Sequence, residues 1–178
     1  MKAIGRFLCV ALMLLTAACC TTEGSPKAHT LRLEMEGGIC SGTAIGPDEV
    51  LTATHCLSNR LVKINDEPVE LLESRQIGPD MIVIRVDRRF DSWAKWADRE
   101  PQQGDPIYYW GNPSGMPDIV RYGYIAGFID GQILVDVEVG KGDSGAAVFD
   151  RDGRVIGVVS GYGRSDVYRL AIIVVRAE

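Results

Sequence analysis

The amino-acid sequence predicts an all-β protein. Short apolar runs of strand length, rich in β-branched residues, recur along the chain and are separated by turn residues. Asp130-Gly131 and Asp152-Gly153 each stand between two such runs. This dipeptide favours a tight hairpin because its backbone accepts positive φ angles. No long stretch beyond the N-terminal segment has helical periodicity. These observations indicate two small barrels or two small sandwiches.

Length and charge narrow the possible functions. The chain has 178 residues, enough for one domain or for two half-domains that share an interface. Hydrophobic residues make up 46% and charged residues 24%, a composition typical of globular proteins. The net charge is −5, and no run of Lys and Arg is interleaved with aromatic residues. We therefore expect no binding to nucleic acid.

Residues 1–18 have the features of a signal segment. A positively charged start precedes an apolar stretch that is too short to span a bilayer comfortably. The following "LTAAC" resembles a bacterial lipoprotein box, in which Cys19 would carry the lipid. The alternative is an ordinary secretory signal cut near Ala18. We expect an exported protein of the periplasm or outer cell envelope, tethered to a membrane through Cys19 or else secreted, with residues 19–29 as a polar tether.

Two cysteines, Cys40 and Cys56, lie beyond the N-terminal segment and its end. The oxidising conditions that an exported protein meets favour a bridge between them. A loop of this length predicts a stabilisation of roughly 3 kcal/mol. Only two histidines exist and no Cys-x-x-Cys pair follows the signal segment, so we expect neither a zinc site nor another cofactor.

The stretch "VGKGDSGAAV" makes Ser144 a candidate nucleophile. A serine nucleophile needs a neighbouring base, a carboxylate that orients this base, and hydrogen-bond donors for the developing oxyanion. His29 precedes the first apolar run and is expected at the surface. His55 stands in "LTATHC", at the end of a strand-like run, and is the candidate base.

Three motifs carry a resemblance to a known family. "LTATHC", "PDMIVIRV" and "GDSG" resemble the histidine, aspartate and serine motifs of chymotrypsin-like (trypsin-fold) serine peptidases of the compact bacterial and viral type. The order of His55, Asp80 and Ser144 is that of this family. The resemblance implies two six-stranded β-barrels with the active site at their interface. We expect the first barrel in residues 30–95 and the second in residues 96–178.

The resemblance also implies a role for each motif residue. His55 would be the general base, Asp80 would orient it, and Cys40 would pair with Cys56. The backbone N–H groups of Gly142 and Ser144 would bind the oxyanion, because a side chain at Gly142 would obstruct the close approach of the substrate.

Asp80 is one of four candidates for the carboxylate. Asp80 alone directly precedes an apolar strand, after a turn at Gly78-Pro79. Asp66 lies in a polar turn where we expect it to be solvated, and Asp87 and Asp91 follow the strand. We therefore assign the role to Asp80.

Several further expectations concern the surroundings of these motifs. Asp143 is expected to form structural hydrogen bonds, since no Ile-Val activation site is visible. Ala146 and Ala147 replace the Gly-Pro of the family, a change that should alter packing more than chemistry. The segment 88–104 should connect the two barrels and carry one short helical turn around its tryptophans.

The resemblance places four residues near the substrate. Glu138 would lie at the base of the primary specificity pocket and Asp166 near its opposite wall, so that a basic substrate residue is favoured. The alternative is that both are solvated loop carboxylates. Ser160 and Tyr162 belong to "GVVSGYG", which resembles the edge strand along the substrate; Tyr162 could instead be an aromatic residue at the barrel rim.

The function predicted from these features is that of an exported serine endopeptidase, which hydrolyses polypeptides through an acyl-enzyme intermediate. One alternative is a catalytically silent trypsin-fold binding protein of the cell envelope. Another is a structural or adhesive envelope lipoprotein with a chance "GDSG". That last alternative leaves the position of His55 beside a cysteine unexplained.

Overall fold

The computed structural model describes residues 25–164 and 169–174, and its strands form two sheets. The strands of the first sheet are β1 (Thr30–Met35), β2 (Gly38–Ala44), β3 (Glu49–Thr52), β4 (Leu61–Ile64), β5 (Glu67–Pro68), β6 (Leu71–Gly78) and β7 (Met81–Val86). The strands of the second sheet are β8 (Pro106–Gly111), β9 (Ile119–Ile129), β10 (Gln132–Asp136), β11 (Ala147–Asp150), β12 (Val155–Arg164) and β13 (Arg169–Val174).

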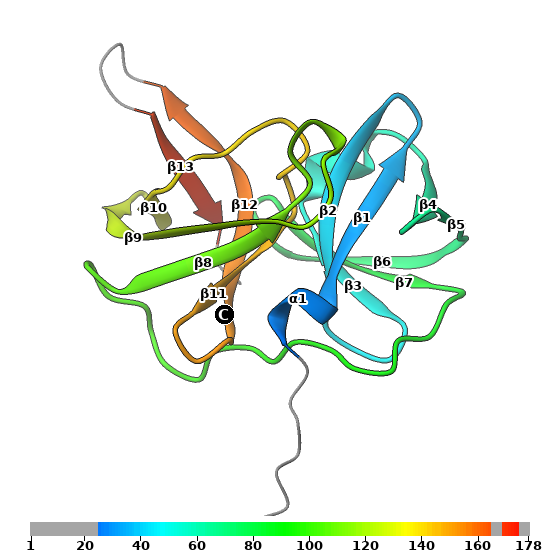
Figure 1. Ribbon diagram of the computed structural model, residues 1–178, viewed down its shortest axis with the longest axis horizontal. Coiled ribbons are helices and arrows are strands. Elements are labelled where there is room, and N and C mark those ends of the chain that lie inside the picture. The colour runs from blue at the N-terminus through cyan, green and yellow to red at the C-terminus, as the bar shows by residue number, and fades with distance from the viewer. Residues whose placement is uncertain (1–24, 165–168, 175–178) are drawn as a thin grey trace, which may run out of the picture.

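The two sheets lie side by side, with the blue-to-teal strands of the first sheet next to the green-to-red strands of the second (Figure 1). The second sheet closes into a barrel in the order β10-β13-β12-β11-β8-β9. The prediction of an all-β, two-barrel fold is confirmed.

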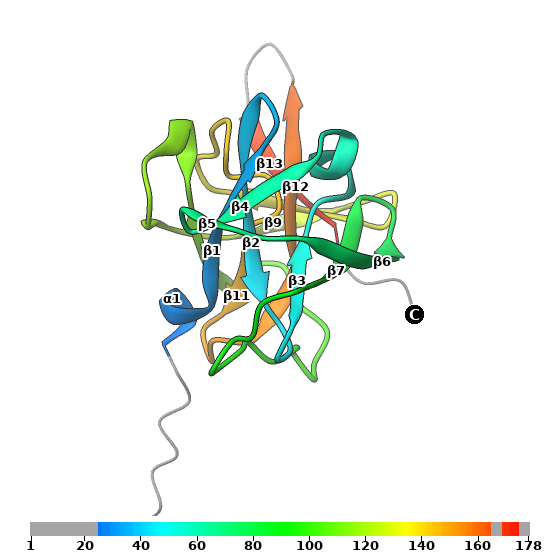
Figure 2. The same ribbon diagram turned by 90° about the vertical axis from the view of Figure 1, so that its right-hand side faces the viewer.

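The first sheet differs in detail from the six-stranded barrel that was expected. It has seven strands in the order β5-β4-β1-β2-β3-β7-β6 and curls without a closing pair between β5 and β6 in the described part of the chain (Figure 2). Strand β5 has only two residues, and one of them, Pro68, lacks the N–H that a further strand would need.

The cores explain why the sheets form where they do. Alternate residues of the strands point inward, so that each sheet encloses an apolar cluster of its own, with Leu33 and Val50 in the first and Ile133 and Val135 in the second. A third cluster lies between the sheets and joins side chains of both, among them Leu51, Met81 and Phe149. Burial of this shared cluster holds the two sheets together.

Both predicted hairpins are confirmed. Asp130 and Gly131, with φ angles of 48° and 74°, connect β9 to β10. The turn between β11 and β12 contains Gly153 at a φ of 77°, and Asp150 Oδ1 accepts hydrogen bonds from Asp152 N and Arg154 N at 2.9 Å each. Both turns use residues that tolerate positive φ, as the sequence indicates.

The predicted helical turn in the connection between the sheets is wrong. Ala94 N donates to Ala44 O at 2.9 Å, and Ala97 N donates to Val155 O at 2.9 Å. Trp96 forms a single parallel bridge with Val155. The connection is extended because its backbone hydrogen bonds go to the two sheets in place of its own turns.

The expectation that His29 is at the surface is also wrong. A short helix, α1 (Pro26–His29), precedes β1, and His29 is buried within it. Helix α1 packs on the second barrel. Lys27 Nζ lies 5.4 Å from the centre of the Trp110 ring and 3.4 Å from Asp118 Oδ2. The end of the predicted tether therefore packs on the folded domain.

The predicted lipidation site, Cys19, lies outside the described residues. Within the part that is described, no helix has both the length and the apolar character needed to cross a membrane.

Candidate active site

His55 and Asp80 are in contact beside the end of β3 and the start of β7. His55 Nδ1 lies 2.8 Å from Asp80 Oδ2, and His55 N donates to Asp80 Oδ1 at 3.0 Å. The fold brings the two together because β3 and β7 are antiparallel neighbours, with Thr52 opposite Ile82. The chain that leaves β3 therefore meets the turn that enters β7. His55 stands in a short 3₁₀ turn (Thr54–Ser58), and its side chain is partly exposed.

The Asp80 carboxylate is also held from the second barrel. Ser160 Oγ, on β12, donates to Asp80 Oδ2 at 2.5 Å. Thr54 N donates to the Asp80 carbonyl at 3.2 Å. The sequence predicted Ser160 only as a substrate contact, and no sequence signal indicated its bond to Asp80. The substrate role of Ser160 stays a prediction.

The other three candidate carboxylates lie elsewhere. Asp66 is exposed and forms an ion pair with Arg32. Asp87 Oδ1 accepts a hydrogen bond from Glu70 N at 2.8 Å, and Asp91 is exposed. Of the four, the one in contact with His55 is Asp80.

Ser144 lies at the seam between the sheets, in the chain that leads into β11. Its carbonyl oxygen accepts a hydrogen bond from Ser41 N of β2 at 2.8 Å and lies 3.7 Å from the Sγ of Cys56. The next residue, Gly145, donates from its N–H to Val159 O at 2.8 Å. The backbone of Ser144 is thus fixed between both sheets, beside the residue that follows His55.

Gly142 occupies a tight turn just before Ser144. Asp143 N donates to Gly140 O at 3.1 Å, and Gly142 has a φ angle of +102°. A β-carbon at Gly142 would lie 2.3 Å from Asn112 O, so the turn excludes any side chain here. Among the described residues, no protein acceptor is bonded to the N–H of Gly142 or of Ser144.

The Asp143 side chain is buried and bonds both to this turn and to the second barrel. Its Oδ2 accepts hydrogen bonds from Gly140 N at 2.8 Å, Tyr109 Oη at 3.1 Å and Arg121 Nη1 at 3.2 Å. Burial raises the pKa of Asp143, and the bond from Gly140 and the charge of Arg121 oppose that rise. These contacts are the structural hydrogen bonds that were expected. Tyr109 and Arg121 as its partners were not predicted.

The predicted disulfide bond between Cys40 and Cys56 is confirmed, with a Cα–Cα distance of 6.2 Å. It joins β2 to the 3₁₀ turn that carries His55. The bond thereby anchors this turn to the strand that contacts Ser144.

The predicted specificity residues are not brought into contact with one another. The Glu138 side chain is exposed, and its carbonyl accepts a hydrogen bond from Tyr109 Oη at 2.6 Å. Asp166 lies outside the described residues. The backbone of Tyr162 is part of β12 and pairs with Ala171 of β13. Their contacts with a substrate stay predictions.

Ala146 and Ala147 are both buried, Ala147 in the cluster between the sheets. This placement agrees with the expectation that the two alanines affect packing.

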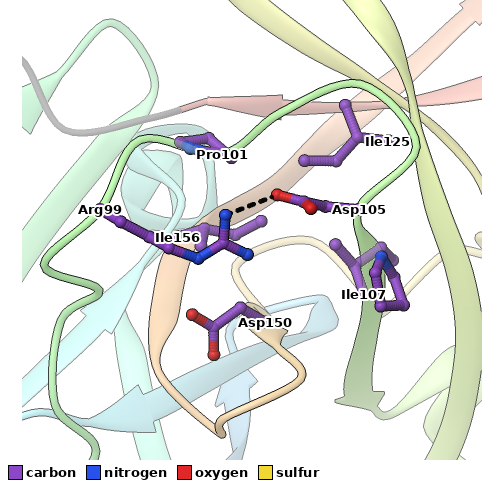
Figure 3. Close-up of a pocket in the computed structure, with 8 residues that line it drawn as sticks. Arg99, Pro101, Asp105, Ile107, Ile125, Asp150 and Ile156 are labelled. Atoms are coloured by element: carbon purple, nitrogen blue, oxygen red, sulfur yellow. Dashed lines mark hydrogen bonds and ion pairs between the residues drawn. The ribbon is translucent and has the colours of Figure 1, made fainter.

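A hollow on the second barrel lies apart from these residues. Arg99 and Asp105 face each other across it, with Nη1 of Arg99 2.9 Å from Oδ2 of Asp105 (Figure 3). Hydrogen bonds from Gln102 N and from Arg99 lower the pKa of Asp105. None of the residues around this hollow is one of the predicted site residues.

Comparison with known proteins agrees with this geometry. The family model described as a trypsin-like peptidase domain matches residues 40–158. A "probable periplasmic serine endoprotease DegP-like" of Brucella suis biovar 1 (strain 1330) is 32% identical over 136 residues, which cover 66% of this chain and 26% of that relative. A protein of the same description from Bartonella henselae is 30% identical over 149 residues, 74% of this chain and 29% of its own. The chain matches only about a quarter of the length of these relatives.

Solved structures share the fold. The Rv3671c protease from M. tuberculosis in its active form superposes with a TM-score of 0.69 at 20% identity, covering 82% of this chain and 74% of that one. A Glu endopeptidase in complex with MPD gives a TM-score of 0.70 at 16% identity, covering 89% of each chain. Because the family model matches residues 40–158, the chain belongs to the trypsin-like peptidase family.

Proposed function

We propose that this protein is an exported serine endopeptidase that uses His55, Asp80 and Ser144 as a catalytic triad. The observation that carries the proposal is the 2.8 Å contact between His55 Nδ1 and Asp80 Oδ2 beside the backbone of Ser144. A polypeptide is the substrate class, as for the endoproteases that the chain resembles.

In this mechanism, Ser144 Oγ attacks the carbonyl carbon of the scissile peptide bond. His55 takes the hydroxyl proton at Nε2, because its other ring nitrogen, Nδ1, faces Asp80 and keeps its proton there. The imidazolium then gives the proton to the leaving amine, and water later releases the acyl group by the same route. Asp80 stabilises the cation and orients the ring, while Ser160 and the N–H of His55 hold the carboxylate in place.

The oxyanion would bind to the N–H groups of Gly142 and Ser144. The positive φ of Gly142 and the absence of a protein acceptor for these two donors within the described chain support this role. Removal of one such donor typically costs roughly 3 kcal/mol of transition-state stabilisation.

An extended substrate would pair with β12. The Val155–Val158 part of this strand pairs with β11, whereas Gly161–Arg164 pairs with β13 on one side only, within the described residues. The free edge supplies N–H and C=O groups for a further strand. Ser160 and Tyr162 therefore form the proposed substrate edge.

Export is proposed from the N-terminal segment, with a lipid on Cys19 as the membrane anchor. The periplasmic description of the relatives supports an exported protein. Incorporation of labelled fatty acid into the full chain, lost in Cys19→Ala, would establish the anchor; secretion without label would instead favour a cut near Ala18.

The activity is tested with a fluorophosphonate probe and with labelled casein. We expect the wild-type protein to bind the probe and release casein fragments, and Ser144→Ala to do neither while unfolding at the same urea concentration. Folded wild-type protein that takes up no probe and cleaves no casein would reject the peptidase in favour of a silent binding protein.

A further inference from the structure

We propose that Ser41 and the loop Asn112–Gly115, called here the 112–115 loop, are positioning elements for the oxyanion hole: the loop fixes the direction of the Lys141–Gly142 peptide, and Ser41 holds the Gly142–Asp143 peptide that follows it. The inference rests on the proposed function. It concerns how the Lys141–Gly142 peptide group, whose N–H points to the proposed oxyanion, is held in place by residues outside the serine motif.

The first contact is made by the 112–115 loop. Ser114 N donates to the carbonyl oxygen of Lys141 at 2.6 Å. The described chain has no cis peptide bond, and in a trans peptide the C=O and the N–H point in opposite directions. By holding the Lys141 carbonyl, Ser114 directs the N–H of Gly142 away from the 112–115 loop. A flipped peptide would place a carbonyl oxygen where the oxyanion must bind.

The second contact comes from the first sheet. Ser41 Oγ donates to the carbonyl oxygen of Gly142 at 2.8 Å, and it accepts from Asn112 N at 3.1 Å and Asn112 Nδ2 at 2.9 Å. A hydroxyl has one donor and two acceptor sites, so the capacity of this hydroxyl is filled. Asn112 Nδ2 also lies 3.3 Å from Leu31 O. Ser41 and Asn112 are buried, so water cannot replace these bonds at low cost.

Backbone geometry supports a dedicated role for the 112–115 loop. Ser114 has a φ angle of +53°, a left-handed conformation that is unfavourable for a residue other than glycine. This conformation is the one in which its N–H reaches Lys141 O. Asn112 O also fills the space that a β-carbon of Gly142 would need, at 2.3 Å. The loop therefore contacts the turn at the Lys141 carbonyl and lies close to the Cα of Gly142.

Ser41 completes the arrangement with its own backbone, because Ser41 N donates to Ser144 O. One residue of β2 thus contacts the residue of each proposed oxyanion donor. The two sheets are joined at the point where the transition-state charge would develop. The expected consequence of losing these contacts is a slower chemical step with unchanged substrate binding.

The test compares Ser41→Ala with Thr43→Val, a matched control. Thr43, also on β2, has a buried hydroxyl that accepts a hydrogen bond from Ala147 N of the second barrel at 3.3 Å. This hydroxyl does not contact the oxyanion turn. With p-nitrophenyl acetate as substrate, we expect Ser41→Ala to lower kcat by at least about tenfold while KM stays within about twofold. The loss in kcat should be smaller than the roughly 10²–10³-fold loss caused by removing a whole oxyanion donor. Thr43→Val should keep kcat within about twofold of the wild type at a comparable loss of stability.

Asn112→Ala provides a second variant in case Ser41→Ala does not fold. This change removes Asn112 Nδ2, which donates to Ser41 Oγ at 2.9 Å, and it leaves the backbone of the 112–115 loop free to keep its conformation. The same selective loss of kcat is expected, together with slower labelling by the fluorophosphonate. Folded Ser41→Ala or Asn112→Ala protein with wild-type kcat would overturn the inference alone. Folded wild-type protein that takes up no probe would reject the proposed function, and the inference with it.

Discussion

Ser160 and Asp80 come from different sheets, and the hydroxyl of Ser160 donates to Asp80 Oδ2 at 2.5 Å. The same carboxylate oxygen lies 2.8 Å from His55 Nδ1. The orientation of His55 is therefore coupled to the packing of β12 against the first sheet. The Asp80 carboxylate is thus bonded from both sheets, by His55 from the first and by Ser160 from the second.

Ser160→Ala is expected to lower kcat about tenfold, because a hydrogen bond to a charged group is typically worth about 1.5 kcal/mol or more. Ser74→Ala, at an exposed position on β6, is the control. Hydrolysis of p-nitrophenyl acetate provides the measurement. An unchanged kcat in folded Ser160→Ala protein would show that His55 and its own backbone N–H suffice to hold Asp80.

Arg121→Gln is expected to destabilise the protein, because Asp143 would lose the cation beside its buried carboxylate. The loss of unfolding free energy should be about 3 kcal/mol near pH 8, as for other broken buried pairs, and urea denaturation measures it. Asp143→Asn in the same background removes the unpaired charge and should restore part of the stability.

The loss in Arg121→Gln should also depend on pH. Burial raises the pKa of Asp143 above its ordinary value of 3.8. At pH values between the ordinary pKa and the raised pKa of the folded state, Asp143 binds a proton in the folded protein but not in the unfolded chain. The contribution of Asp143 to the free energy of unfolding therefore falls as the pH rises. The destabilisation should therefore be smaller near pH 4.5 than near pH 8. An equal loss at both would contradict the role of the charge.

We expect the buried His29 to give stability a second pH dependence, of opposite sign to that of Asp143. Burial lowers the pKa of His29 below its ordinary value of 6.5, and neither ring nitrogen has a hydrogen-bond partner among the described residues. The unfolded state then binds a proton that the folded state does not, so stability falls as the pH drops below 6.5. Between pH 8 and pH values below 6.5, Tm of His29→Leu should fall less than Tm of the wild type, when each protein is compared with its own Tm at pH 8. The same fall in both proteins would exclude His29 as its source.

Glu138→Gln tests the proposed specificity pocket. If Glu138 faces a basic side chain of the substrate, the neutral variant should lose its preference for cleavage after Arg or Lys by about tenfold, the order of one charge contact at intermediate dielectric. Glu100→Gln, an exposed carboxylate in the connection between the sheets, is the control. Equal ratios of kcat/KM for basic and apolar peptides in wild type and Glu138→Gln would favour a solvated loop carboxylate.

Much of the fold could be predicted because its signals are local. Positive φ angles at Asp130-Gly131 and Gly153 follow from the residue types, and the alternation of apolar residues indicates strands. The helical turn expected around Trp93 and Trp96 was wrong, since hydrogen bonds to Ala44 and Val155 keep this connection extended. Such partners are far away in the sequence and leave no local pattern.

The candidate site divides in the same way. The all-β class, the Cys40–Cys56 bridge, and the motifs around His55, Asp80 and Ser144 could be predicted from the amino-acid sequence, because each depends on residue type and immediate neighbours. The hydrogen-bond partners of these motifs became visible only in the folded chain. Four features depend on chain packing: the bond of Ser160 to Asp80, the bonds of Arg121 and Tyr109 to Asp143, the contacts of Ser41 and Asn112 with the Gly142 turn, and the burial of His29. The partner of a hydroxyl or an amide is set by the register between strands that are far apart in the sequence. The residue type at one position does not encode that register.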